Sequence, residues 1–306
     1  MYRIGIDLGG TNTAAGLVDA QGRIIDRASV KTNLPTSLDR IVENITGLCH
    51  ELMTRHGLTS EDISMVGVGV PCTANVQTGW MEDADHLGFS GGPLRQQLRV
   101  ALQLPVAIGN DADCAAWGEY QAGSYDSDSF ILVTLGTGVG GGLILGGRLI
   151  TGVHNAAGEI GHMSIHMEGV PCECGRRGCF ERYASATALI QQAREATDEP
   201  ITEAKEVFDR VAAGDPICTA VLDRYTTYLA EGLANLINIF GPAYVCLGGG
   251  VSLAGDALLQ PVQKKTNEKI FAKAAQRKPQ IILAKLHNDA GILGAALLEL
   301  NEEAKR

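Results

Sequence analysis

Several features that would direct a chain to a membrane or to a nucleic acid are missing from this sequence. No apolar run approaches the roughly 20 residues that a helix needs to cross a bilayer. The opening residues, Met1 to Ile4, enter a strand-like pattern without the layout of a signal peptide. No run of Lys or Arg interrupts a formal net charge of -10 at pH 7. We therefore expect no membrane and no nucleic acid among the partners of this protein.

Most of the cysteines stand alone in apolar settings, which is typical of buried, reduced thiols. These isolated cysteines are Cys49, Cys72, Cys114, Cys218 and Cys246. Reduced thiols favour a cytoplasmic location. The 306 residues, 45% of them apolar, are typical of a globular protein and suggest two domains in one compact chain. Because no low-complexity linker separates two halves, we expect helices to join them at a hinge.

The other three cysteines form a dense group with a histidine. Cys172, Cys174 and Cys179 lie within eight residues, and His162 precedes the first of them by ten positions. Three thiolates and one imidazole make a complete tetrahedral ligand set for Zn²⁺ and leave no position for water, so the predicted site is structural. His166 is an alternative fourth ligand. A loop with free cysteines is the other interpretation, which the complete and locally spaced ligand set disfavours.

Two carboxylates flank this cysteine group. Glu159 lies just before it and Glu181 just after it. Gly175 and Gly178 allow the backbone between the cysteines to turn back around an ion. A zinc knot formed in this way would hold both carboxylates in fixed positions.

One pattern occurs twice: a strand, a glycine turn, a second strand, a tight turn and a third strand. The first copy covers residues 2–30 and the second covers residues 130–151. Their glycine turns, at 9–13 and 136–141, could direct backbone N–H groups at an anion, and Asp7 lies at the corner of the first. Each turn alone could be an ordinary hairpin. The duplication favours two phosphate-binding turns that grip one polyphosphate across a cleft.

A third glycine turn, at residues 248–252, lies between a predicted strand and a predicted helix. It would suit close backbone approach to a flat ring or a ribose. Residues 72–93 are rich in Gly, Asp and Asn, and we expect a long irregular connection there, which is often functional. Helices are predicted after the cysteine group at about 180–193, 202–213 and 217–239.

Asn110 and Asp111 follow a predicted strand at residues 105–108 and begin a helix that runs to about Tyr120. One interpretation of Asp111 is a helix cap or a first-turn acid. The other is functional, because the carboxyl ends of the strands in an open α/β sheet face the ligand crevice. The local pattern alone favours the cap.

Six motifs distributed along the chain carry a resemblance to a known family. They are D-L-G-G-T at 7–11, G-N-D-A at 109–112, L-G-T-G-V-G-G-G at 135–142, G-E-I-G-H-M at 158–163, C-E-C-G-R-R-G-C-F-E at 172–181 and L-G-G-G-V at 247–251. Together they resemble the ROK family of bacterial sugar kinases and sugar-responsive repressors, and within it the glucokinase type. The resemblance covers nearly the whole chain, and its most specific part is the cysteine motif.

The resemblance implies an α/β fold of the actin, Hsp70 and hexokinase (ribonuclease H-like) kind, duplicated, with two domains around a cleft. The smaller domain would contain residues 1–111 and 290–306, and the larger one residues 112–289 with the zinc-binding loop. It further implies a cytoplasmic, homodimeric enzyme of carbohydrate metabolism, such as glycolysis. This enzyme would use ATP to phosphorylate a hexose, with glucose at its 6-hydroxyl as the first expectation.

The resemblance also implies roles for individual residues. Asp111 would be the catalytic base, which fits the transfer of a phosphoryl group to a sugar hydroxyl. The implied ligands of the ATP phosphates and Mg²⁺ are Asp7, Gly9, Gly10, Thr11, Gly136, Thr137 and Gly138, with Gly248, Gly249 and Gly250 near the adenosine. The implied sugar ligands are Asn110, Asp111, Glu159, His162 and Glu181.

Two departures from the family pattern concern the loop that borders the implied sugar pocket. The family usually has proline-glycine where this chain has Pro71 and Cys72, and commonly proline-asparagine where it has Asp85 and His86. Kinases of N-acetylmannosamine, N-acetylglucosamine, fructose or allose are therefore the nearest alternatives. A sugar-sensing regulator is an alternative of another class, and the acidic charge and the start at the first strand argue against it. Retention of Asp111 and both phosphate turns disfavours a non-catalytic sugar-binding protein.

Overall fold

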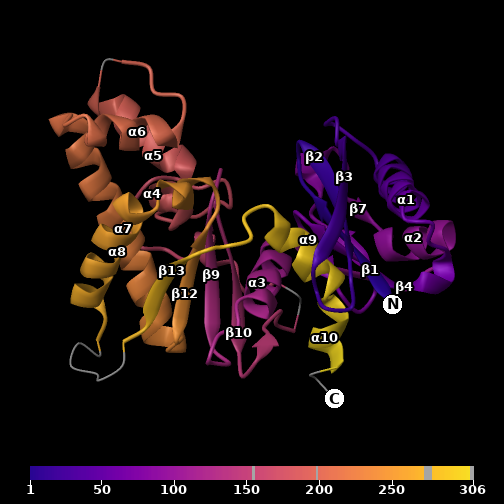
Figure 1. The fold of residues 1–306 in the computed structure, drawn as a ribbon. Helices are drawn as coiled ribbons and strands as arrows, with labels where there is room; N and C mark the ends of the chain where they lie inside the picture. Colours follow the sequence, from indigo (N-terminus) through magenta and orange to yellow (C-terminus); the bar gives the residue numbers. More distant parts are fainter. Residues whose placement is uncertain (154–155, 198, 272–277, 304–306) are drawn as a thin grey trace. The chain divides into compact units, whose positions relative to one another are not determined.

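The structure is a computed structural model that describes residues 1–153, 156–197, 199–271 and 278–303 (Figure 1). It confirms an α/β fold. The chain packs into two compact units: the first is Met1–Asp128, Gly142–Gly158 and Lys285–Arg306, and the second is Ser129–Gly141 and Glu159–Ala284. The predicted division at residues 111 and 290 differs, because packing groups 112–128 and 142–158 with the first unit. Whether the predicted boundaries separate the parts that move during function stays a prediction.

The first sheet is built around the strand at the start of the chain. Its strands are β1 (Tyr2–Leu8), β2 (Asn12–Val18), β3 (Ile24–Lys31), β4 (Ile63–Val70) and β8 (Val106–Asn110), in the order β3-β2-β1-β4-β8. The first three form an antiparallel meander, and β1, β4 and β8 run parallel. The carboxyl ends of these three strands therefore lie at the same end of the sheet, and Asp7 and Asn110 are found there.

The helices of the first unit cover this sheet. They are α1 (Leu38–Arg55), α2 (Leu94–Leu102), α3 (Asp111–Ala122), α9 (Asp289–Ala296) and α10 (Leu298–Glu303). Helix α1 buries one apolar face, with Ile41, Ile45 and Leu52 almost fully inaccessible, as the helical spacing predicts. These side chains join those of β1 and β4 in one hydrophobic core.

Helices α3 and α9 pack unusually closely, because glycines remove side chains at their crossing. A Cβ atom at Gly118 would overlap the carbonyl oxygen of Ala290, and one at Gly294 would overlap that of Cys114. Helix α9 also contacts β1 and β4. The helix that begins at Asp111 is thus held firmly against α9 and, through it, against the sheet.

The connection expected to be irregular between residues 72 and 93 contains a small sheet of its own, so that prediction was wrong. Its antiparallel strands are β5 (Thr73–Asn75), β6 (Trp80–Glu82) and β7 (Gly91–Gly92). Asn75 organises the first turn, because its side-chain oxygen accepts the N–H groups of Gln77 and Thr78 at 3.2 and 3.0 Å. Polar composition indicated a loop, but local side-chain bonding stabilises a hairpin.

The second sheet repeats the plan of the first, which confirms the predicted duplication. Its strands are β9 (Phe130–Leu135), β10 (Val139–Leu145), β11 (Arg148–Leu149), β12 (Tyr244–Gly248) and β13 (Gln280–Leu283). Their order, β11-β10-β9-β12-β13, matches that of the first sheet strand for strand. Strand β12 pairs parallel with both β9 and β13.

The helices of the second unit are α4 (Glu181–Ala184), α5 (Ala186–Ala196), α6 (Ala204–Ala212), α7 (Pro216–Phe240) and α8 (Asp256–Lys269). The helix predicted at about 180–193 is interrupted at Ser185. This residue is extended, with φ -80° and ψ 168°, and its hydroxyl accepts the Ala188 N–H at 3.0 Å. Ser185 therefore ends α4 and caps α5.

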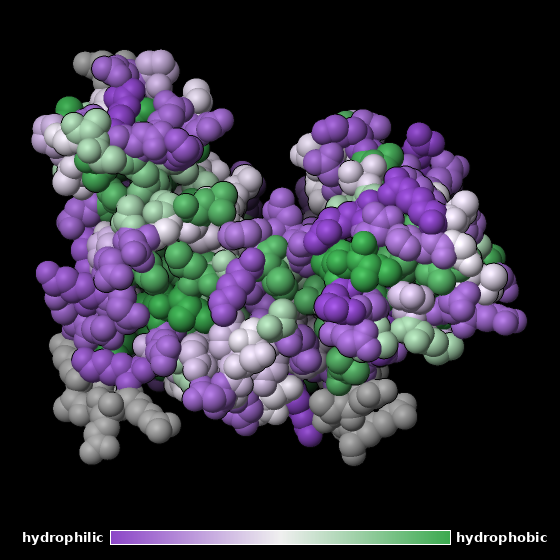
Figure 2. Space-filling view, viewed as in Figure 1, coloured by the Kyte–Doolittle hydropathy of each residue, from purple (hydrophilic) through white to green (hydrophobic). Residues whose placement is uncertain are grey.

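Polar side chains cover most of the face of each unit that Figure 2 shows, and apolar side chains are visible there in smaller groups. Large apolar residues that are exposed, such as Val100 and Ile239, lie on different helices. Within the part of the chain that the structure describes, no helix is both long and apolar enough to cross a membrane.

Candidate functional site

The first glycine turn joins β1 to β2 and is held by a buried threonine. The Gly9 N–H donates to the Asn12 carbonyl at 3.0 Å. Thr32 Oγ1 donates to the Gly9 carbonyl at 2.7 Å, and the Thr32 N–H donates to the Thr11 carbonyl at 3.0 Å. Sequence reasoning missed Thr32, because a threonine after a strand is too common to be a signal. Its burial and its two bonds show that it shapes the turn.

A pocket of about 760 Å³ opens beside this turn. Asp7, Gly9, Gly10 and Thr11 line one part of it, and Asn288 and Asp289 at the start of α9 line another. The size lies in the range typical of small-molecule sites, roughly 300–1,000 Å³. Backbone N–H groups of a glycine turn together with a carboxylate suit a phosphate and its cation.

Asp7 is the electrostatically unusual residue of this pocket. Burial raises the pKa of its carboxyl group to about 6 from an ordinary value of 3.8, and the negative charge of Asp111 contributes in the same direction. A carboxyl group that is costly to ionise gains from a nearby cation. Oxygen ligands are also the ones that Mg²⁺ prefers, so Asp7 could hold this ion.

Asn110, and not Asp111, is the N-cap of α3. Its side-chain oxygen accepts the N–H groups of Ala112 and Asp113 at 2.9 and 3.2 Å. Asp111 follows as the first helical residue, and its Oδ1 also accepts the Ala112 N–H, at 2.7 Å. The capping function that the pattern suggested for Asp111 is therefore carried mainly by its neighbour. Asp111 directly follows the carboxyl end of β8, where Asn110 pairs with Val70 of β4.

In the second unit, the turn between β9 and β10 lies next to Glu181. The Gly136 N–H donates to the Gly138 carbonyl at 3.1 Å. A Cβ atom at position 138 would lie 2.7 Å from Oε2 of Glu181, so a larger residue there would displace this carboxylate from its present position. The start of α5 supports the turn, because the Ala186 N–H donates to the Gly136 carbonyl at 2.8 Å.

The third glycine turn lies against the end of β9. Gly249 has φ 79°, and a Cβ atom there would lie 2.6 Å from the backbone nitrogen and oxygen of Leu135. Ser252 closes the turn by donating from its hydroxyl to the Gly249 carbonyl at 2.7 Å. The structure thus brings the turns at 136–138 and 248–250 to the same end of the second sheet, at β9 and β12.

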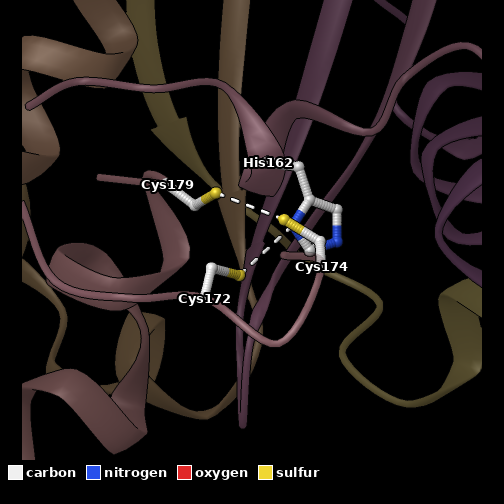
Figure 3. A group of neighbouring side chains, drawn as sticks. All are labelled: His162, Cys172, Cys174 and Cys179. Atoms are coloured by element: carbon white, nitrogen blue, oxygen red, sulfur yellow. Dashed lines mark hydrogen bonds between the residues drawn. The ribbon is translucent and has the colours of Figure 1, made fainter. Parts of the chain in front are cut away.

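The cysteine group and His162 form a compact cluster (Figure 3). Nδ1 of His162 lies 3.7 Å from Sγ of Cys172, and the Sγ atoms of Cys174 and Cys179 lie 3.6 Å apart. One ligand atom from each of the four residues falls within 4.8 Å of all the others. The other candidate, His166, instead stacks on Tyr183 with ring centroids 6.1 Å apart.

These separations fit a metal ion. Bonds of about 2.3 Å from zinc to sulfur and about 2.0 Å to nitrogen place tetrahedral ligand atoms roughly 3.5 to 3.8 Å apart. The distance from Nδ1 of His162 to Sγ of Cys172, 3.7 Å, and the distance between the Sγ atoms of Cys174 and Cys179, 3.6 Å, lie in this range. The ring atom that faces the sulfurs is Nδ1, so Nε2 of His162 is directed away from the ligand set.

Local backbone geometry forms this cluster. Gly175 and Gly178 have φ 85° and 76°, the left-handed conformation that favours glycine. The Arg176 N–H lowers the pKa of the Cys174 thiol, whereas burial raises that of Cys172 to about 12. A bound cation would ionise both thiols, because a coordinating thiol loses its proton.

The two flanking glutamates occupy different environments. Glu181 is the first residue of α4, and its Oε1 accepts a bond from Sγ of Cys172 at 3.1 Å and lies 3.7 Å from Nδ1 of His162. Glu159 is exposed, and its carbonyl accepts the His162 N–H at 3.1 Å. Both glutamates are therefore tied to the residues of the cluster, Glu181 through its side chain and Glu159 through its backbone.

Known proteins resemble this chain over nearly its whole length. The ROK family profile matches residues 3–302. A glucokinase of Halalkalibacterium halodurans is 34% identical, over 99% of this chain and 96% of that protein. An N-acetylmannosamine kinase of Escherichia fergusonii is 31% identical, over 99% of this chain and all of that one. The crystal structure of a ROK family glucokinase from Streptomyces griseus, in complex with glucose and AMPPNP, is 32% identical and covers 97% of this chain and 99% of its own, with a TM-score of 0.80. The predicted fold is thereby confirmed.

Proposed function

The chain belongs to the ROK family, and we propose that it is an ATP-dependent hexose kinase, with glucose as its first expected substrate. The observation that carries this proposal is the position of Asp111. Its carboxylate lies at the carboxyl end of the parallel strands of the first sheet, and its charge adds to the larger effect of burial in raising the pKa of Asp7 at the phosphate-type turn. An acceptor for the proton of a sugar hydroxyl and a cradle for phosphates therefore occur in one unit. The glucokinase relatives support the same reaction.

Asp111 acts in this proposal as the general base. It accepts the proton of the attacking hydroxyl as the new bond to phosphorus forms. Its bond to the Ala112 N–H orients the carboxylate. Phosphoryl transfer needs little covalent chemistry from the protein, so the remaining catalysis comes from positioning the reactants and neutralising phosphate charge.

The glycine turns bind the nucleotide. The backbone at Gly9, Gly10 and Thr11 holds phosphate oxygens in the first unit, and Gly136, Thr137 and Gly138 do the same in the second. Gly248, Gly249 and Gly250 lie near the adenosine. Mg²⁺, when bound at Asp7, neutralises phosphate charge, and Asp7 holds it as a carboxylate.

The cysteine cluster holds a structural zinc ion in this proposal. His162, Cys172, Cys174 and Cys179 are its ligands. The gathering of one ligand atom from each within 4.8 Å of the others, with two of the pairs at 3.7 and 3.6 Å, supports this assignment. Because Nδ1 of His162 faces the sulfurs, Nε2 keeps its proton and can donate to a sugar hydroxyl. The same cluster orients Glu159 and Glu181, which with Asn110 bind further hydroxyls.

N-Acetylmannosamine is the second candidate substrate, because a kinase of this sugar is 31% identical over the full length. The residues that we propose to decide between the sugars are Cys72 and His86, in and next to the small sheet β5-β6-β7. A polar pocket can discriminate strongly between sugars that differ by one group. We also propose that the protein is cytoplasmic and forms a homodimer, and light scattering of the purified protein would test the dimer.

The deciding experiment measures ADP release from Mg-ATP across a panel of hexoses and N-acetylhexosamines, with Asp111→Ala beside the wild type. We expect turnover with glucose and a loss of at least about 100-fold in the variant, because a general base contributes this much. Asp39→Asn, an exposed acid of α1, is the matched control and should keep full activity. If N-acetylmannosamine gives the higher kcat/KM, the second candidate is correct. Sugar binding without ADP release would overturn the kinase and favour a sensor.

A further inference from the structure

Helix α3 carries a buried carboxylate that the proposed reaction does not use. Glu119 is 1% exposed. Its Oε1 accepts the Leu286 N–H at 2.7 Å, and its Oε2 accepts the Lys285 N–H at 3.2 Å. A buried polar group needs hydrogen bonds in place of those it would make with water, so both bonds help to hold this side chain in position.

The segment that Glu119 holds is short and conformationally demanding. It joins the end of β13, at Leu283, to the first residue of α9, Asp289. His287 within it has φ 50°, a left-handed conformation that is uncommon for a residue other than glycine. The Asp289 N–H donates to the Leu286 carbonyl at 2.9 Å. Leu286, whose N–H is bound by Glu119, therefore also fixes the start of α9.

The start of α9 lines the pocket beside the first glycine turn, to which the proposed function assigns the nucleotide phosphates. Asn288, Asp289 and Ile292 line it together with Asp7. Within the first turn of the helix, a Cβ atom at Gly291 would lie only 3.1 Å from Cγ of Asp7. A shift of this end of α9 therefore moves the wall of the pocket and the surroundings of Asp7 together.

We propose that Glu119 is a positioning residue for phosphoryl transfer, whose carboxylate sets the first turn of α9 against Asp7. The inference rests on the proposed function, because it assigns the pocket beside Asp7 to the nucleotide. Helix α3 begins with Asp111, so one helix bears the base at one end and the support of the phosphate pocket at the other. The glycine contacts of Gly118 and Gly294 make the link between α3 and α9 stiff.

Glu119→Gln tests this role with almost no change of shape. A carboxylate offers two acceptor oxygens, whereas a carboxamide offers one and turns an NH₂ group against the other N–H. The backbone amide, of Lys285 or Leu286, that loses its acceptor should then exchange with deuterium faster. We expect KM for Mg-ATP to rise by about tenfold, since small misplacements at a reacting centre are costly. KM for the hexose should change less than twofold.

Trp117→Phe is the matched control on the same helix. It removes the bond from the indole N–H to the Leu297 carbonyl, at the opposite end of α9. Both variants should lower the melting temperature, but only Glu119→Gln should weaken nucleotide binding. Equal nucleotide affinities in the two variants would show that Glu119 is merely structural and would overturn the proposal.

A further measurement and a further variant distinguish failure of this proposal from failure of the proposed function. Titration with Mg-AMPPNP measures nucleotide affinity without turnover, so the test also works if no sugar is phosphorylated. If the wild type binds Mg-AMPPNP but phosphorylates no sugar, the proposed kinase activity is refuted. The role of Glu119 is then decided by the Mg-AMPPNP affinities of the wild type and the variants. If Glu119→Gln does not fold, Glu119→Asp, which keeps two oxygens but is shorter, should show the same rise in KM for Mg-ATP in milder form.

Discussion

Replacement of Asp7 by asparagine should stabilise the protein at neutral pH while removing the carboxylate that we propose to hold Mg²⁺. Burial, and then the charge of Asp111, raises the pKa of Asp7 to about 6 from 3.8. A difference of about two pKa units corresponds to about 3 kcal/mol of unfavourable free energy for the ionised form in the folded state. Asparagine has nearly the same shape and carries no charge, so Asp7→Asn should recover up to about this amount.

The sign of the pH dependence follows from the raised pKa. The folded protein favours the protonated carboxyl, so the wild type has its full stability from this group only below pH 3.8 and loses it as the pH rises through about 6. The advantage of Asp7→Asn should therefore be largest above pH 7 and vanish near pH 4. Urea unfolding of both proteins at pH 5 and pH 8 measures this difference.

Asp19 provides a control of opposite sign. The Arg23 N–H is the largest cause that lowers the pKa of Asp19, so its stabilising effect is present at neutral pH and is lost as the pH falls. Asp19→Asn should thus destabilise the protein at pH 8 and less so in acid. If Asp7→Asn destabilises at pH 8, or gains equally at pH 5 and pH 8, the reasoning about Asp7 is refuted. Addition of Mg-ATP at pH 8 should stabilise the wild type more than Asp7→Asn.

Two further substitutions test the cysteine cluster and the first turn. Elemental analysis should find roughly one zinc ion per chain in the wild type, and Cys179→Ser should lose it. The same variant should raise KM for the hexose more than KM for ATP. Cys218→Ser, another buried thiol, should keep the metal, and equal metal contents in the two variants would contradict the assigned ligands. Thr32→Val removes the bond to the Gly9 carbonyl, so it should cost about 1 kcal/mol in urea unfolding and raise KM for ATP several-fold. Thr226→Val loses a similar bond in α7, and a rise in KM for ATP there as well would contradict a local effect of Thr32.

Several parts of the site could be predicted because their evidence is local. Cys172, Cys174 and Cys179 lie so close along the chain that any compact loop brings their sulfurs together, and His162 follows the same logic. The paired turns at 9–13 and 136–141 were recognisable because strand and glycine patterns repeat. Local evidence did not separate Asn110 from Asp111 at the helix start, because either side chain can cap a helix.

Other parts depended on contacts that no local pattern reports. The small sheet between residues 72 and 93 forms because the Asn75 side chain bonds to its own turn, and composition indicated only a loop. Ser185 divides a helix whose apolar spacing continues on both sides. In each case one side chain, through two hydrogen bonds at Asn75 and one at Ser185, favours a structure that the residue pattern did not indicate.

The order of residues alone determined the metal-type ligand set, the two phosphate-type turns and the duplicated α/β plan, because each depends on spacing within a short segment. Tertiary structure alone decided which groups are buried and what meets them. It gave Asp7 its raised pKa, joined Thr32 to Gly9, and placed Glu119 against a segment 166 residues further along the chain. Burial and long-range pairing set charge and position at this site, and these properties arise only when the folded chain brings distant residues together.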